Sequence, residues 1–444
     1  MSTGTAAGAT LTSKPTLPTN RRYGVMVLLA GMICINYLDR FNIAAAVPTI
    51  MKEFGFSPVR MGLLMSAFGW TYLLCMFPVG HLLRRKSPKA VGFFSCLGWG
   101  LATLLTAAVS GFYSFFVVRL LLGATESAGY PTCTRIASIW TPKHERTTAT
   151  GIFDCSASVG SALSPILVVW IILHWGWRYS FVLSGLAALV FAFVWQRYYH
   201  DPDKDPKVSR EELEYIRQGQ VQVGDGNVAK AKEVPMYKLL TYRRIFAMCS
   251  GFFLYMYFAT VFHVWIPAYL VHAKGFSLKA MGIAVTFPFL AGITVELTGA
   301  RLLDKWLQRG ASLTKVRRTG QLFSYFGTAI CVFLAIAAAT PTMTVVWLTA
   351  AYGIKAICGA QNWAISSEVA PQGQVGPVAA LNGMAGALAV IVAPLASGFL
   401  IQTRWGYNGA LFVMAVALLM AGILYGLLDY EPVTLKSALA STNQ

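Results

Sequence analysis

Residues 23–46 read YGVMVLLAGMICINYLDRFNIAAA, an apolar run long enough to cross a hydrocarbon core of roughly 30 Å as a helix. Arg21 and Arg22 precede the run, as basic residues do in cleavable signal peptides. Asp39 and Arg40, however, lie inside it, and a charged pair is not typical of the apolar region of a signal peptide. We therefore expect a retained first transmembrane helix that carries two ionisable groups.

Similar apolar runs recur as far as residue 428. Of the 444 residues, 56% are hydrophobic and 12% are charged, whereas roughly 25% of the residues in soluble domains are charged. These values exclude a soluble multidomain protein and indicate an all-α integral membrane protein with twelve spans. We predict the spans at residues 23–46, 61–83, 89–109, 112–136, 147–172, 177–198, 243–270, 280–302, 318–339, 342–366, 376–401 and 407–428.

The 36 Lys and Arg residues exceed the 18 Asp and Glu residues, and the excess sits in short loops rather than on one basic face. This distribution does not indicate nucleic-acid binding. Cytoplasmic loops of membrane proteins carry such an excess, so we expect a multi-pass plasma-membrane protein (inner membrane in a Gram-negative cell) with both termini in the cytoplasm. The eight cysteines show no paired spacing, and we expect no disulfide framework, metal site or cofactor.

The two halves of the chain share a pattern. Pro142, after the fourth span, is followed 23 residues later by Pro165, and Pro371, after the tenth span, is followed at the same distance by Pro394. Two parallel sets of six helices predict bundles that face each other across a central site. The central loop contains a capping box, Ser209–Glu212, that opens a short helix. The predicted parts are a tail at 1–22, a bundle at 23–198, a loop at 199–241, a bundle at 242–428 and a tail at 429–444.

Ionisable residues within the spans are functional candidates, because a charge in the bilayer is costly unless it is paired or faces a hydrated cavity. Arg119 and Glu126 are seven residues apart, which is two helical turns, so they share one helix face. Asp39 and Arg40 are adjacent and diverge by about 100°. We predict two ion pairs between helices, Asp39 with Arg119 and Arg40 with Glu126. The alternative is that these four charges only hold the helices together.

The chemistry of these groups suggests a role for each. The planar guanidinium of Arg40 suits a carboxylate or another oxyanion, but its partner carboxylate must be neutralised before a substrate anion can replace it. Burial favours the neutral form of a carboxyl group, and a nearby cation favours the charged form. We therefore expect Asp39 and Glu126 to bind and release protons. Sodium coupling stays open, because carboxylates can serve either ion.

Two loops resemble the signature of the major facilitator superfamily, Gly-x-x-x-Asp-Arg/Lys. They are residues 80–85, after the second span, and residues 299–305, after the eighth. The resemblance implies that Arg84, Arg85 and Asp304 take part in gating on the cytoplasmic side. Asp304 keeps the pattern, whereas Arg84 stands where the superfamily usually has Asp.

More specific motifs resemble the anion:cation symporter family of that superfamily. They are Asn36–Asn42 in the first helix, Arg119 with the run Glu126–Thr132 in the fourth, and the turn Trp140–Arg146. The resemblance runs from about Tyr23 to Leu428. It implies proton-coupled uptake of an organic anion by a functional monomer in the lipid bilayer, with Asp39 and Glu126 carrying protons and Arg40 holding the anion.

The same resemblance implies further substrate contacts. They are Tyr37, Tyr72, Asn362, Trp363 and Asn382. His263 is a candidate from the seventh helix, although packing histidines are common, and the tyrosines and Trp363 can equally pack the bundle. Ala157 and Phe252 stand where sugar-acid members carry amides, which favours a short or aromatic carboxylate, or a sulfonate. Asp154 is either a third proton site or a cap for a backbone break near Gly151.

Glu296 and Glu368 are interpreted as gating or structural groups toward the cytoplasmic helix ends. An organic-anion exporter or exchanger of the same fold is the first rival function, because the charges fit either direction of transport. A membrane-embedded enzyme is the second, but the sequence contains no grouped His, Cys and Asp residues with ligand spacing and no Gly-rich phosphate loop.

Overall fold

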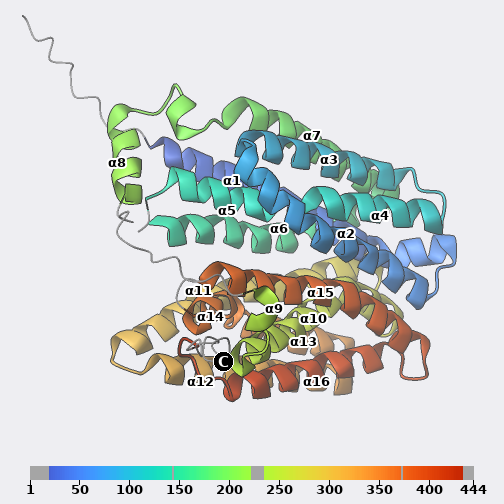
Figure 1. Cartoon of the computed structure of the whole chain (residues 1–444). Coiled ribbons are helices and arrows are strands. Elements are labelled where there is room, and N and C mark those ends of the chain that lie inside the picture. Colours follow the sequence, from blue (N-terminus) through green and yellow to red (C-terminus); the bar gives the residue numbers. More distant parts are fainter. Residues whose placement is uncertain (1–19, 143–144, 222–234, 372–373, 434–444) are drawn as a thin grey trace, which may run out of the picture.

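The computed structural model describes residues 20–142, 145–221, 235–371 and 374–433, and these residues are almost wholly helical. Figure 1 shows two packed groups of helices, which we call the N-terminal and C-terminal halves. The N-terminal half consists of α1 (Arg21–Phe54), α2 (Pro58–Arg85), α3 (Pro88–Ala107), α4 (Phe112–Glu126), α5 (Gly129–Trp140), α6 (Arg146–Trp175) and α7 (Trp177–Tyr198).

The C-terminal half consists of α10 (Arg243–His272), α11 (Leu278–Gln308), α12 (Leu313–Ala337), α13 (Pro341–Ala356), α14 (Gly359–Val369), α15 (Val375–Gln402) and α16 (Gly406–Gly426). The short helices η2 (Pro202–Lys204), α8 (Arg210–Val221) and α9 (Met236–Leu239) lie between the halves in sequence. Ten of the described helices are long and apolar enough to cross a membrane. The remaining two spans are each divided, α4 with α5 and α13 with α14, which completes the predicted twelve-helix bundle.

The division of the fourth and tenth spans corrects the prediction of continuous helices at 112–136 and 342–366. In the fourth span, Pro131 has no N–H to donate to the carbonyl of Ser127, so the helical ladder is interrupted there. The Ser127 hydroxyl also donates to the carbonyl of Ala124 at 2.7 Å. In the tenth span, Ile357 and Cys358 make tight hydrogen bonds to residues three positions earlier. Each break places its flanking side chains deep in the bundle.

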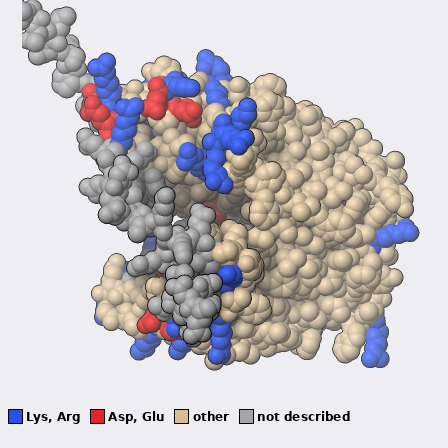
Figure 2. Space-filling model, viewed as in Figure 1, with Lys and Arg blue, Asp and Glu red and all other residues tan. Residues whose placement is uncertain are grey.

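The halves meet closely at the end of the molecule opposite α8. A Cβ atom on Gly282 of α11 would lie 2.9 Å from Cβ of Val169 in α6, and one on Gly398 of α15 would lie 2.6 Å from the carbonyl oxygen of Pro58 in α2. Glycine therefore permits close approach across the halves. At the end near α8, Figure 2 shows a hollow between the halves with acidic atoms visible inside it, and most of the visible charged groups gather at this end.

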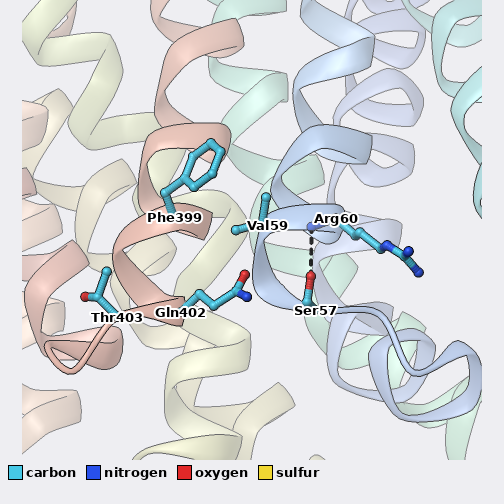
Figure 3. Close-up of a pocket in the computed structure, with 6 residues that line it drawn as sticks. All are labelled: Ser57, Val59, Arg60, Phe399, Gln402 and Thr403. Carbon is cyan, nitrogen blue, oxygen red and sulfur yellow. Dashed lines mark hydrogen bonds between the residues drawn. The ribbon is translucent and has the colours of Figure 1, made fainter.

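A shallow surface pocket lies where α2 begins and α15 ends (Figure 3). Its walls are Ser57, Val59, Arg60, Phe399, Gln402 and Thr403. The Ser57 hydroxyl accepts a hydrogen bond from the backbone N–H of Arg60 and so caps α2, while the Arg60 side chain points away from α15. The pocket marks the outer end of the α2–α15 contact and contains none of the predicted site residues.

Ser209 caps α8 as predicted, and the Glu212 carboxylate of the predicted capping box binds the start of α1. The Ser209 hydroxyl accepts from the backbone N–H of Glu212 at 3.2 Å, and α8 begins at Arg210. The Glu212 carboxylate accepts from the backbone N–H groups of Arg21 at 3.1 Å and Arg22 at 3.0 Å. Arg22 also pairs with Glu145 at 3.1 Å. A carboxylate that accepts hydrogen bonds from the first N–H groups of a helix stabilises its start. Glu212 of α8 therefore stabilises the first turn of α1.

Candidate functional site

The site is centred on Arg40 of α1. Its Nε donates to Oε2 of Glu126 at 2.8 Å, and the side chains are 25% and 0% exposed, respectively. The break after α4 places Glu126 at the end of a helix, where its side chain can reach α1. This ion pair between the first and fourth spans is the predicted one, and it lies inside the bundle rather than toward lipid.

Three aromatic rings surround the Arg40 guanidinium. Its Cζ lies 5.2 Å from the ring centre of Tyr37, 5.1 Å from that of Phe68 and 5.1 Å from that of Tyr72, within the range of cation–π attraction. Its two terminal nitrogens, Nη1 and Nη2, donate no hydrogen bond to any of the described residues. The rings and Glu126 therefore hold the guanidinium in place while two of its nitrogens can still receive an anion.

The predicted pair of Asp39 with Arg119 is wrong. Asp39 accepts a hydrogen bond from the hydroxyl of Thr103 in α3, and among the described residues no ion pair joins it to Arg119. Arg119 instead places its guanidinium 5.1 Å from the ring centre of Phe68, which also faces Arg40. Both Asp39 and Glu126 nevertheless act electrostatically on Arg119.

Asp154 of α6 joins the site through two tyrosines. The Tyr130 hydroxyl donates to Oδ1 of Asp154 at 3.2 Å and lies 3.5 Å from the hydroxyl of Tyr37. The alternative in which Asp154 caps a backbone break near Gly151 is wrong, because α6 continues without interruption through both residues. The tyrosines instead connect Asp154 to the surroundings of Arg40.

His263 of α10 lies where the two halves meet. One ring nitrogen is 2.9 Å from the hydroxyl of Tyr352 in α13. The ring makes an edge contact with Phe41 of α1 at a centroid distance of 4.9 Å and lies 5.5 Å from Phe289 of α11. His263 therefore bonds within its own half and packs across the halves against Phe41, the residue next to Arg40.

The predicted asparagines are both fully buried. Oδ1 of Asn362 accepts from Gln321 at 3.1 Å and from Tyr325 at 3.0 Å, whereas its Nδ2 has no partner among the described residues. Neither amide atom of Asn382 in α15 has a partner in the described part of the chain. Unpaired buried amides are costly, which is consistent with a polar ligand.

The remaining predicted residues stand as follows. Arg84 and Arg85 are exposed at the end of α2. The side chains of Trp363 and Asp304 lie outside the described residues. Glu368 pairs with Arg317 of α12 through two hydrogen bonds, at 2.8 and 3.1 Å.

Glu296 lies beside the break between α13 and α14, not toward a helix end as predicted. Its Oε1 would be 3.4 Å from a Cβ atom on Gly359, the first residue of α14. The sequence places Lys355 among the possible ionisable candidates within the spans but assigns it no particular role; its Nζ is 4.7 Å from the ring centre of Tyr255 and 5.0 Å from that of Tyr352. Thr103 was missed because an isolated hydroxyl carries no sequence signal, whereas the internal repeat would have singled out Lys355.

A bundle of two six-helix halves around a charged, aromatic-lined centre is the architecture of a membrane transporter. The family model described as Major Facilitator Superfamily matches residues 29–362, and the chain belongs to this superfamily. The match confirms the predicted fold and the prediction of a multi-pass transporter instead of an enzyme.

Similar proteins include several named transporters. The D-galactonate transporter of Escherichia coli is 31% identical over 413 residues, covering 91% of this chain and 95% of that protein. A probable galactarate/D-glucarate transporter of Bacillus subtilis is 31% identical, with coverages of 94% and 93%. A probable sulfoacetate transporter of Cupriavidus necator is 28% identical, with coverages of 91% and 93%.

Solved structures show the same fold. A bacterial homologue of the human lysosomal transporter Spinster, crystallised in an inward-facing and unoccupied conformation, has a TM-score of 0.74 at 17% identity, covering 92% of this chain and 97% of the other. A D-xylose-proton symporter has a TM-score of 0.70 at 14% identity, with coverages of 92% and 98%.

Proposed function

We propose that this protein is a secondary active transporter that imports a small organic anion together with protons. The observation that carries the proposal is the arrangement of Arg40, which is held through Nε by the buried Glu126 while its terminal nitrogens are unbonded within the described residues. A guanidinium of this kind binds carboxylates and other oxyanions through two parallel hydrogen bonds.

Proton coupling follows from the competition at Arg40. An ionised Glu126 holds the guanidinium and opposes the approach of a second anion. Protonation of Glu126 removes that competition, and the substrate anion then replaces it as the counter-charge. Asp39, buried beside Thr103, is the second proton carrier in this scheme. Both carboxylates release their protons when the substrate has left on the other side.

Substrate movement is proposed to occur by alternating access. The structure is closed where α2 meets α15 and is hollowed near α8. We assign the α8 end to the cytoplasm, because the short basic loops lie there, and place the protein in the plasma membrane as a functional monomer. The resulting state would release substrate to the cytoplasm.

The named substrates of the similar transporters, galactonate, galactarate, glucarate and sulfoacetate, support a carboxylate or sulfonate substrate. Ala157 and Phe252, which are predicted to replace amide side chains, are both buried. Phe252 is also packed against Gly386 of α15. These two positions supply no amide donors, so we propose a substrate with fewer hydroxyls than a sugar acid.

The decisive experiment uses the Glu126→Gln variant in proteoliposomes. Gln resembles a protonated Glu in shape and cannot titrate, so binding and counterflow should survive while uptake driven by an imposed proton gradient fails. Glu368→Gln is the matched control, because Glu368 is ion-paired outside the site. Unimpaired gradient-driven accumulation by Glu126→Gln would refute the coupling role, and loss of binding in a well-folded variant would favour a purely structural one.

Direction and coupling ion are tested with the same vesicles. Proton and sodium gradients are imposed separately and in both senses across membranes with known protein orientation. Import predicts accumulation with an inward proton gradient. Accumulation driven by a sodium gradient alone would favour sodium symport. Accumulation that occurs only with an outward proton gradient would favour the rival exporter.

A further inference from the structure

Hydrogen bonds around the two helix breaks establish which residues correspond between the halves. In the N-terminal half, the Ser95 hydroxyl of α3 donates to the carbonyl of Thr125 at 2.7 Å. In the C-terminal half, the Ser324 hydroxyl of α12 donates to the carbonyl of Ile354 at 2.8 Å. Each pair of equivalent residues is separated by 229 positions, so Thr125 and Ile354 occupy the same place in the repeat.

The glycines of the same helices support this register. A Cβ atom on Gly98 of α3 would lie nearest to the Thr125 side chain, and one on Gly327 of α12 nearest to the Ile354 side chain. The next residues along the chain are Glu126 and Lys355. The C-terminal half therefore carries a cation at the position where the N-terminal half carries the acid that binds Arg40.

Lys355 is half-buried, and its ammonium group is only partly satisfied. It lies over the rings of Tyr255 and Tyr352. Among the described residues, it makes no hydrogen bond or ion pair, although Glu296 of α11 and Asp154 of α6 act on it electrostatically. An ammonium in such a place attracts an anion as a point charge.

Lys355 and Arg40 belong to one site, and His263 connects them. The His263 ring is bonded to Tyr352, which lies under Lys355, and packs against Phe41, which follows Arg40. Both cations act electrostatically on this imidazole. One cation from each half therefore acts on the same histidine.

We propose that Lys355 is a second anion subsite, so that the preferred substrate is a dianion with one charged group at Arg40 and the other at Lys355. The inference rests on the proposed role of Arg40 and adds the substrate class. Because the two subsites belong to different halves, a dianion contacts both halves at once. A monoanion bound at Arg40 leaves Lys355 interacting with Glu296 and Asp154.

The test compares α,ω-dicarboxylates from malonate to adipate with their monoamides, which keep the shape but lose one charge. Binding is measured by calorimetry on the purified full chain at constant pH. Wild type should bind at least one dicarboxylate roughly tenfold or more tightly than its monoamide, the size expected of a charged hydrogen bond. Lys355→Met should reduce that preference below about twofold, because it weakens dicarboxylate binding more than monoamide binding.

Controls make each outcome decisive. Lys355→Arg should keep the preference, and so should Lys315→Met, which removes a lysine at the exposed start of α12. Where Lys355→Met does not fold, Glu296→Gln replaces it and should tighten dicarboxylate binding alone. A wild type without the preference, or a folded Lys355→Met that retains it, would overturn the inference. Arg40→Gln distinguishes the two proposals, because unchanged monoamide binding in that variant contradicts the proposed function itself.

Discussion

Gly62 of α2 lies so close to Pro394 of α15 that a Cβ atom on the glycine would be 2.5 Å from the proline's carbonyl oxygen. The two halves therefore meet backbone to backbone at the end opposite α8. Backbone atoms cannot move aside as a flexible side chain can, so this contact requires glycine in the closed arrangement. A transporter that alternates between two states must break the contact in every cycle.

Gly62→Val should shift the population toward the state in which this end is open. Accessibility is measured as labelling of Ser397→Cys in α15, a position that is buried in the closed arrangement, by an impermeant maleimide, with subtraction of labelling in the same protein without that cysteine. Gly80→Ala is the control, because a Cβ atom on Gly80 of the same helix would meet nothing within 4 Å. Equal labelling of the two variants would show that the close contact does not set the equilibrium.

Arg40→Lys should lose most substrate binding although the charge is kept. A compact ammonium cannot reproduce the two parallel hydrogen bonds of a guanidinium, nor its packing among Tyr37, Phe68 and Tyr72. We expect a fall in affinity of roughly tenfold or more, measured by calorimetry. Arg301→Lys, at an exposed position of α11, is the control. Near-normal affinity would make Arg40 a steering charge rather than a ligand.

Thr103→Val should impair proton coupling more than substrate binding. The Thr103 hydroxyl is the hydrogen-bond partner of Asp39, and a carboxylate that loses a donor takes up a proton more readily. The pH at which gradient-driven uptake is half-maximal should therefore move upward, while counterflow at low pH stays normal. Thr106→Val is the control, since its hydroxyl bonds, within the described residues, only to the backbone of its own helix. An unchanged pH profile would remove Asp39 from the coupling scheme.

Asn382→Leu should stabilise the protein without ligand and weaken transport. Both amide atoms are buried without a partner among the described residues, and a buried unpaired amide costs about 1–3 kcal/mol. Thermal unfolding in detergent should show a higher midpoint, and uptake should fall. A lower midpoint with unchanged uptake would identify Asn382 as a structural residue.

Glu212→Gln should destabilise the protein without changing substrate affinity. The carboxylate caps the first turn of α1 and contacts Arg22, and losing its charge at a helix start costs on the order of 1 kcal/mol. The expected readout is a lower unfolding midpoint in detergent with unaltered calorimetric binding. Glu214→Gln on the same helix is the control. A change in affinity would mean that α8 influences the central site.

Much of the fold follows from local properties of the sequence. The length of each apolar run and the polar turns between runs determine where a membrane helix begins and ends, so spans such as 177–198 agree with the structure to the residue. The pairing of Arg40 with Glu126 was also predictable, because few charges are available in the bilayer and helical periodicity restricts which can meet.

The sequence alone determined a twelve-helix transporter with a charged centre and an internal repeat. Only the tertiary structure decided that Asp39 bonds to Thr103 and that Arg119 faces Phe68. The physical reason is that span positions depend on short stretches of hydrophobicity. The partner of a buried charge depends instead on which side chains of other helices arrive within about 3 Å, and packing alone sets that distance.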